Sequence, residues 1–386
     1  ASDVYKRQPF TLPLYAFQLH VAIGMAVFLK MLVAGLCAYY AARRFHFTPP
    51  YALLAALSFQ MSGVLLIGHW HPASDVMPWL PLLLPCMQRL LLGEHRVWAW
   101  LALLFGVMSL GGDPEMLIGI ISFALLLTFT YSLRTYTYRH LTSALPLLVF
   151  SLLLGAAISA IQWAPFIEFA RYGAFSESSH SFFHLRDFSK LIAPVSHANS
   201  SDASLWLPAG LVGVLLFPLW LAVRPFANRM RKRRLEAFLL ATLLILVTAP
   251  VFLPYVRRIP GLSLLDVFHF SAPFPLAMGF LAATTADEWI HLNAEKCRRS
   301  LKRLAGHLPV LWGALFAAAC FAARPSSPPL ASILPSLCVA AILLSLIVVT
   351  SFRPQEKLLV FSIIFVTAAF SCWTYAPNTL LSLIHI

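Results

Sequence analysis

Charged residues are scarce in this sequence of 386 residues: Asp, Glu, Lys and Arg together make up 11% of the chain. A soluble domain carries about 25%, so a soluble fold would lack more than half of its usual charged surface. Hydrophobic residues make up 60%, and the mean hydropathy is +0.78. No soluble fold of this size buries that much apolar side chain. The composition therefore predicts a membrane protein and excludes soluble enzymes, soluble nucleic-acid-binding proteins and disulfide-rich secreted modules.

The six cysteines form no CxxC pair and no spacing typical of zinc ligands. Most of them lie within apolar runs, where cysteine packs as a small apolar residue. The sequence also lacks a low-complexity linker, a soluble domain and a convincing internal repeat, so an inverted-repeat transporter gains no direct support. A single polytopic membrane domain over residues 9–380 is the expected organisation.

Long apolar runs, by contrast, are abundant. A transmembrane helix needs about 17–25 mostly apolar residues, and roughly twelve runs approach or reach that length. The expected fold class is therefore all-α, a polytopic transmembrane helical bundle. The run at residues 76–92 contains three prolines, so a re-entrant or interfacial segment is the alternative there. The runs cover residues 21–42, 50–68, 76–92, 97–111, 114–133, 143–163, 205–223, 236–255, 269–290, 306–323, 329–351 and 357–376.

The distribution of basic residues predicts the orientation in the membrane. If every run crosses and residue 21 starts outside, 19 of the 28 Lys and Arg residues lie in inside connections and six in outside ones. Cytoplasmic loops carry an excess of Lys and Arg, which favours this orientation. The bias would reverse if the run at 76–92 did not cross, so that run is expected to span. The net charge of +13 thus indicates cytoplasmic loops beside anionic membrane lipids rather than a nucleic-acid partner.

A short turn at residues 111–115 carries the sharpest chemical signal on the outer side. Its sequence is Gly-Gly-Asp-Pro-Glu, so two glycines end one apolar run and a proline begins the next. Asp113 and Glu115 therefore lie at a helix N-terminus, where negative charge is favoured. Such a pair can accept a proton as a catalytic base or hold a divalent cation such as Mg or Mn. A helix hairpin with two capping acids is the alternative interpretation.

A second outer segment, residues 68–75, places His69, His71 and Asp75 in a short external loop. These side chains are candidate substrate-binding residues. The two histidines, together with the acids of the 111–115 turn, are also candidate metal ligands. The spacing is not a specific metal signature, so packing of the histidines at the membrane interface is the alternative.

Five further charged residues complete the candidate substrate site. Arginine at the outer membrane edge suits the phosphate or pyrophosphate of a lipid-linked substrate, with simple contact to lipid phosphates as the alternative. Lys30 lies near the middle of a span, where a lysine is costly and faces a polar interior. It is therefore either functional or paired within the bundle. The five are Lys30, Glu168, Arg171, Arg257 and Arg258, of which the second and third belong to the longest outside connection, residues 164–204.

The order of these segments resembles that of the bacterial YfhO-like membrane proteins, which are placed in the glycosyltransferase-C superfamily. The resemblance covers roughly residues 10–290. The matching stretches are His20 through Tyr39-Tyr40 to Arg43-Arg44, Ser62-Gly63, Trp79-Leu80-Pro81-Leu82, Gly112-Asp113-Pro114-Glu115, Ala160-Ile161-Gln162 through Pro165 to Glu168, and Ile259-Pro260-Gly261 with Val267-Phe268-His269-Phe270. Family members usually have His-Pro-Glu or His-Pro-Gln in place of the Asp-Pro-Glu of this turn, and an arginine near residues 268–270.

The resemblance implies a glycosyltransferase of the bacterial cytoplasmic (inner) membrane with its active face outside. Such an enzyme takes a sugar from a polyprenyl-phosphate donor and passes it to an envelope polymer or glycolipid acceptor. Members of the superfamily use external-loop carboxylates as the base and, in many cases, as ligands for a divalent metal, which gives Asp113 and Glu115 the catalytic role. The alternatives are a transporter or flippase of lipid-linked saccharide without bond chemistry, and a non-catalytic membrane scaffold.

The two ends of the chain are expected to be foreign to the fold. Residues 1–8 and 381–386 resemble translated adapter sequence from assembled environmental DNA. A first span that starts outside also implies an earlier helix. In the resembled superfamily that helix and the loop after it carry a principal catalytic acid, so residues 1–386 alone are expected to be an inactive fragment.

Overall fold

The structure, a computed structural model, is entirely helical in the residues that it describes, which confirms the all-α class for that part of the chain. The described ranges are residues 12–60, 73–134, 138–163, 229–256 and 267–292, with a few isolated positions besides. The predicted runs at 205–223, 306–323, 329–351 and 357–376 lie outside them, apart from one isolated position. The total number of spans therefore stays a prediction.

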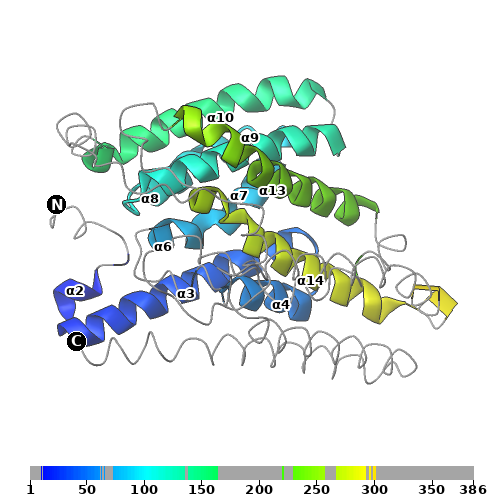
Figure 1. Cartoon of the computed structure of the whole chain (residues 1–386), viewed down its shortest axis with the longest axis horizontal. Helices are drawn as coiled ribbons and strands as arrows, with labels where there is room; N and C mark the ends of the chain where they lie inside the picture. Colours follow the sequence, from blue (N-terminus) through cyan, green and yellow to red (C-terminus); the bar gives the residue numbers. More distant parts are fainter. Residues whose placement is uncertain are drawn as a thin grey trace, which may run out of the picture.

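The described helices pack as a bundle in which distant segments lie side by side (Figure 1). The most extensive helix–helix contacts join α3 to α4, α4 to α14, α8 to α10 and α9 to α13. In chain order the elements are α2 (Pro13–Ala16), α3 (Leu19–Arg44), α4 (Pro49–Gln60), α6 (Ala73–Val76), η3 (Met77–Trp79), α7 (Leu80–Leu91), α8 (Val97–Ser109), α9 (Pro114–Arg134), α10 (Tyr138–Ile158), α13 (Arg229–Val256), η7 (Val267–Phe270) and α14 (Pro273–His291).

Helices α3 and α9 match two predicted spans closely, because their apolar runs are long and uninterrupted. α3 contains the run at 21–42, and α9 contains the run at 114–133. α4 differs, since it ends at Gln60 whereas its apolar run continues for eight more residues, and Ser62 lies outside any helix. Serine and the glycine that follows it are poor helix formers. Apart from Ser62 and Leu65, the rest of the run lies outside the described residues, so the span predicted at 50–68 stays a prediction beyond Gln60.

Large apolar side chains are exposed on several helices. Phe28 of α3, Trp100 of α8 and Phe252 of α13 are 60–65% exposed. In water such a surface is unfavourable, whereas lipid tails cover it without cost. In the part of the chain that the structure describes, two helices, Leu19–Arg44 and Pro114–Leu133, are long and apolar enough to cross a bilayer. Exposure and length together support the predicted membrane location.

The proline-rich run at 76–92 forms one helical segment. It begins with α6, passes through the single turn of η3 and continues as α7. Pro78 and Pro81 lie in the first turns of η3 and α7, where a missing N–H costs little. From residue 73 to residue 91 the segment measures about 28 Å at the α-helical rise, close to the hydrocarbon core of about 30 Å. Its length supports the prediction that this segment spans.

Helix α7 lies in the interior of the described bundle. It contacts α3, α8 and α9, and Figure 1 shows it between the pair α3 and α4 and the group α8, α9 and α10. Leu80, Leu83, Leu84 and Met87 are completely buried there. The segment at 76–92, for which the sequence allowed a re-entrant or interfacial alternative, is thus part of the core of the described bundle.

An aromatic cluster joins the turn between α3 and α4 to two later helices. The rings of Phe45 and Phe47 meet the ring of Phe280 in α14 edge to face, with centroids 5.2 and 5.8 Å apart. Phe238 of α13 meets the same ring at 5.9 Å. Edge-to-face pairs add attraction beyond the burial of area. The cluster fixes four helices together at one end of the bundle.

Candidate functional site

A buried ion pair joins α3 to α6. Lys30 Nζ lies 2.7 Å from Asp75 Oδ1, and it also donates a hydrogen bond to Ser74 Oγ at 3.0 Å. The side chains of Lys30 and Asp75 are only 13% and 4% exposed. A charge removed from water needs a partner of this kind. The lysine predicted as either functional or paired is therefore paired.

Asp75 lies in a buried helical turn and not in an open loop. Residues 73–76 form α6, and all four are buried. The sequence suggested an external loop up to residue 75, because no apolar run begins before residue 76. The structure starts the helix three residues earlier, so that Asp75 faces Lys30.

The turn at residues 111–115 packs directly on α6. A Cβ atom on Gly111 would lie 2.8 Å from Val76 Cγ2 and 3.2 Å from the backbone carbonyl carbon of Asp75. Gly112 has a φ of +81°, a conformation that favours glycine. Both glycines are therefore required for the turn to approach α6 so closely.

Asp113 caps the N-terminus of α9. Its Oδ1 accepts a hydrogen bond from the backbone N–H of Met116 at 2.8 Å, and the residue is 6% exposed. This is the geometry of an N-cap aspartate, which satisfies one of the free N–H groups of the first turn. The capping interpretation of Asp113 is thus observed, and the catalytic role of this residue stays a prediction.

The acid of α6 and the acids of the 111–115 turn lie close together. A Cβ atom on Gly111 would lie 3.2 Å from the backbone carbonyl carbon of Asp75, so the turn that carries Asp113 rests directly on the residue that pairs with Lys30. Acidic residues that are distant in sequence are therefore neighbours.

Glu115 is the more accessible acid of the turn. It lies in the first turn of α9 and is half-buried, whereas Asp113 and Asp75 are almost completely buried. Of the three carboxylates, Glu115 is the one that a ligand reaches most easily.

His269 is a neighbour of this region that the sequence did not place in the site. It lies in η7, is 9% exposed, and its backbone carbonyl touches the position where Gly119 of α9 would carry a side chain. Gly119 is four residues after Glu115, and such positions share one face of a helix. η7 therefore packs on the face of α9 that begins with Glu115. Only the tertiary contact reveals this, because more than 140 residues separate the two segments.

Several predicted site residues lie outside the described residues. The two histidines of the 68–75 segment and the outer-edge residues belong to this group, as does the connection at 164–204. Their predicted roles stay predictions. They are His69, His71, Glu168, Arg171, Arg257 and Arg258.

The predicted metal site is only partly described. In the ranges that the structure describes, no group of three or more His, Cys, Asp or Glu residues is placed to hold a metal ion. The ammonium of Lys30 lies beside Asp75, and one oxygen of Asp113 is occupied as a helix cap. Two of the candidate ligands, His69 and His71, lie outside the described residues, so the metal role of Asp113, Glu115 and these histidines stays a prediction.

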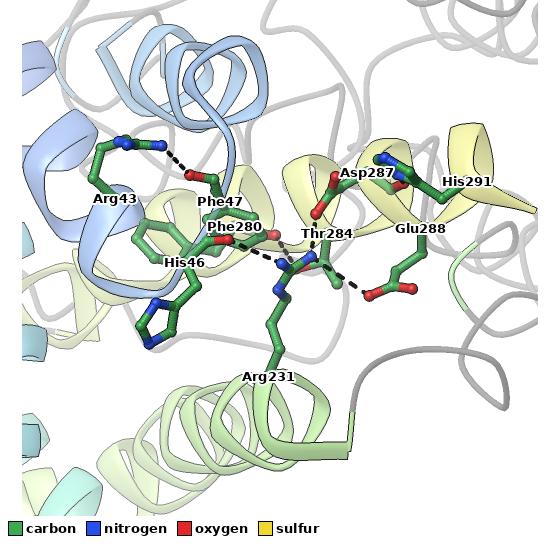
Figure 2. Close-up of polar contacts among 9 residues, drawn as sticks. All are labelled: Arg43, His46, Phe47, Arg231, Phe280, Thr284, Asp287, Glu288 and His291. Atoms are coloured by element: carbon green, nitrogen blue, oxygen red, sulfur yellow. Dashed lines mark hydrogen bonds and ion pairs between the residues drawn. The ribbon is translucent and has the colours of Figure 1, made fainter.

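The opposite end of the bundle carries an arginine junction (Figure 2). Arg231 of α13 pairs with Asp287 of α14, lies 3.5 Å from a carboxylate oxygen of Glu288, and donates to the backbone oxygen of His46 at 2.9 Å. Its guanidinium also lies over the ring of Phe47, 5.2 Å from the centroid. A multiply paired guanidinium is typical of buried arginine.

This junction bears on the predicted orientation. It brings together the turn after α3, the first residues of α13 and the last turns of α14, which adjoin connections that the charge bias assigns to the cytoplasm. A further contact brings in the end of α7: with its amide oriented to accept, Gln88 receives a hydrogen bond from Arg234 Nη1 at 2.9 Å. These helix ends therefore meet at one end of the described bundle, in agreement with a shared side of the membrane.

No family model matches this chain, and no curated protein matches it. Two solved structures resemble it, both of ArnT from Cupriavidus metallidurans. With the form bound to undecaprenyl phosphate the TM-score is 0.45 at 17% identity over 92% of this chain. With the apo form the TM-score is 0.38 at 18% identity over 91% of this chain. In both cases the chain spans 62% of the length of ArnT.

Proposed function

We propose that this protein is a membrane glycosyltransferase that moves a sugar from a polyprenyl-phosphate donor to an envelope polymer or glycolipid acceptor on the outer face of the inner membrane. The carrying observation is the pairing of Lys30 with Asp75 directly under the turn of Asp113 and Glu115. One cation and three carboxylates gather at the end of the bundle away from the basic connections. Intramembrane ionisable groups mark functional sites by default, and the resemblance to YfhO-like proteins points to two of these residues, Asp113 and Glu115.

Glu115 is the proposed general base. The hydroxyl of an acceptor is a poor nucleophile until a carboxylate takes its proton. Asp113 is committed to the cap of α9 and Asp75 to Lys30, whereas Glu115 is half-buried at the same helix N-terminus. Asp113 then acts as a positioning residue, because its cap fixes the first turn that carries Glu115.

The leaving group of the reaction is the lipid phosphate. A bond forms between the acceptor oxygen and the anomeric carbon, while the bond from that carbon to the phosphate oxygen breaks. The electron pair leaves with the phosphate, and the acceptor proton goes to Glu115. The growing negative charge needs cations. Arg257 and Arg258, at the outer edge by the predicted topology, are proposed for this role, and Lys30 holds Asp75 in place below.

A transporter or flippase of lipid-linked saccharide is the second candidate. The buried Lys30–Asp75 pair is the observation that favours it, because ionisable pairs inside a helical bundle also mark transport pathways. Such a protein needs the pair and the arginines, but it needs no base beside the acceptor.

Sugar transfer in proteoliposomes tests the proposal. The purified protein receives polyprenyl-phosphate sugars labelled in the sugar, and transfer of the label to an envelope acceptor fraction is measured. Glu115→Gln removes the base but keeps the shape, so the rate should fall at least about 100-fold, with donor binding unchanged. Glu94→Gln is the matched control, since Glu94 is an exposed acid in the connection between α7 and α8.

The outcomes separate the two candidates. Equal transfer by the Glu115→Gln variant and the parent would remove Glu115 from the reaction. If labelled lipid crosses the membrane in the parent and the variant alike, and no new glycosidic bond forms, the protein is a flippase and not a transferase.

A further inference from the structure

An apolar groove with a volume of about 380 Å³ lies between α7 and α8, with Tyr40 of α3 on its border. Leu82, Pro85 and Cys86 form the wall from α7, and Leu104 belongs to the wall from α8. The volume falls within the range of about 300–1,000 Å³ that is typical of ligand sites. The lining is nearly all apolar, so the groove suits a hydrocarbon chain.

The groove opens towards the membrane. Trp100 and Leu103 of α8 line it and are 65% and 46% exposed. In a bilayer these side chains face lipid tails and not water. A chain of a membrane lipid can therefore enter from the side, without passing through the bundle.

The length of the groove matches one leaflet of the bilayer. The wall formed by the end of η3 and by α7 runs from Trp79 to Arg89, which is about 15 Å at the α-helical rise. The hydrocarbon core of a bilayer is about 30 Å thick. Since Arg89 is near the end of α7 that the charge bias assigns to the cytoplasm, the groove covers the inner half of the membrane.

The cytoplasmic end of the groove is basic. Arg89 lines the groove, and the guanidinium of Arg44 lies over the ring of Tyr40, 5.1 Å from its centroid, with a hydrogen bond from Nε to the Tyr40 hydroxyl of 3.0 Å. Arg89 also pairs with Glu94 at 2.6 Å, and both side chains are more than 40% exposed. Such an exposed pair contributes little stability, so Arg89 can turn to a phosphate without a large loss.

From these features we propose that the groove binds one acyl chain of an anionic phospholipid of the cytoplasmic leaflet, with the lipid phosphate held by Arg89 and Arg44. The apolar wall accommodates the chain, and the arginines at its cytoplasmic end select negative charge. The proposed sugar donor reacts at the opposite end of the bundle, beside the 111–115 turn. A donor phosphate would therefore lie far from these two arginines, and the inference is independent of the proposed transfer.

A photoreactive lipid tests this inference. The full chain is placed in nanodiscs of phosphatidylcholine that contain a minor share of phosphatidylglycerol with a photoreactive acyl chain, and cross-linked peptides are mapped by mass spectrometry. Cross-links should concentrate between residues 79 and 107. Arg89→Gln should lower them about fivefold, the effect of one basic residue at an anionic surface. Cys86→Phe, which fills the groove, should lower them as well.

Two controls make the result decisive. Arg96→Gln removes an exposed arginine from the connection between α7 and α8. Arg96 does not line the groove, so this variant should leave the cross-links at the parent level. Photoreactive phosphatidylcholine should label the segment about fivefold less than phosphatidylglycerol. Equal labelling by the two lipids, equal loss in Arg89→Gln and Arg96→Gln, or displacement of the label by polyprenyl phosphate but not by phosphatidylglycerol would overturn the proposal.

Discussion

Lys30 in α3 and Asp75 in α6 form a buried ion pair whose charged atoms, Nζ and Oδ1, lie 2.7 Å apart. The pair contributes no net charge to the interior, and it ties the middle of one predicted span to the start of another. Removal of one partner leaves the other charged and buried, whereas removal of both leaves neither. The first prediction uses this difference.

Lys30→Met should lower the free energy of unfolding by about 3 kcal/mol, because Asp75 then remains buried without its cation. The double variant Lys30→Met with Asp75→Leu should recover most of that loss. Thermal unfolding in detergent measures both. A double variant that is as unstable as the sum of the two single variants would show that the residues do not act as a pair.

Gly111→Ala should lower the free energy of unfolding by about 1–3 kcal/mol, because its Cβ would overlap Val76 and the carbonyl of Met108, 2.8 and 2.9 Å away. Gly24→Ala is the matched control, since nothing lies within 4 Å of its Cβ position. Unfolding curves of the two variants should diverge. If Gly111→Ala behaves like the control, the turn does not rest on α6 as described.

Arg231→Gln should lower the free energy of unfolding by about 3 kcal/mol, because Asp287, a 4% exposed residue, loses its cation. Lys232→Gln changes the charge by the same amount at the next position and serves as the control. The loss should persist at high salt, since buried pairs are screened little. If the two variants are equally stable, the contacts of Arg231 do not stabilise the packing of α13 against α14.

The orientation is testable with single cysteines in a cysteine-free background. A cysteine at Ser178, in the predicted external connection, should react with a membrane-impermeant thiol reagent on intact cells. A cysteine at Arg96 should react only after the cells are opened, because the charge bias assigns it to the cytoplasm. The opposite pattern would invert the topology and move the candidate site to the inner face.

The sequence predicted the parts of the fold that depend on long local patterns. α3 and α9 follow from uninterrupted apolar runs, and the turn before Asp113 follows from two glycines and a proline. The sequence left open whether Lys30 is functional or paired within the bundle, and it did not identify Asp75 as the partner, since no local pattern links side chains 45 residues apart.

The sequence also predicted some features of the candidate site and missed others. The acids of the 111–115 turn stood out by their spacing and by their place at a helix N-terminus. The contact of η7 with Gly119 was beyond the reach of the sequence, because a backbone contact between distant segments leaves no compositional mark. Asp75 was selected as a candidate substrate-binding residue, a role that stays a prediction, whereas its burial and its partner come only from packing.

Pro85 lies inside α7, between two parts of the segment that are held by different neighbours. A proline offers no N–H to the carbonyl four residues earlier, and this makes its position the easiest place for a helix to bend. The half that begins at α6 carries Asp75 and is attached to Lys30, while the other half is anchored to α13 through Gln88. Pro85 is also part of the groove wall, so the position at which α7 resists bending least lies beside the proposed acyl chain. A bend there would tilt the part that carries Asp75 relative to the part held by α13.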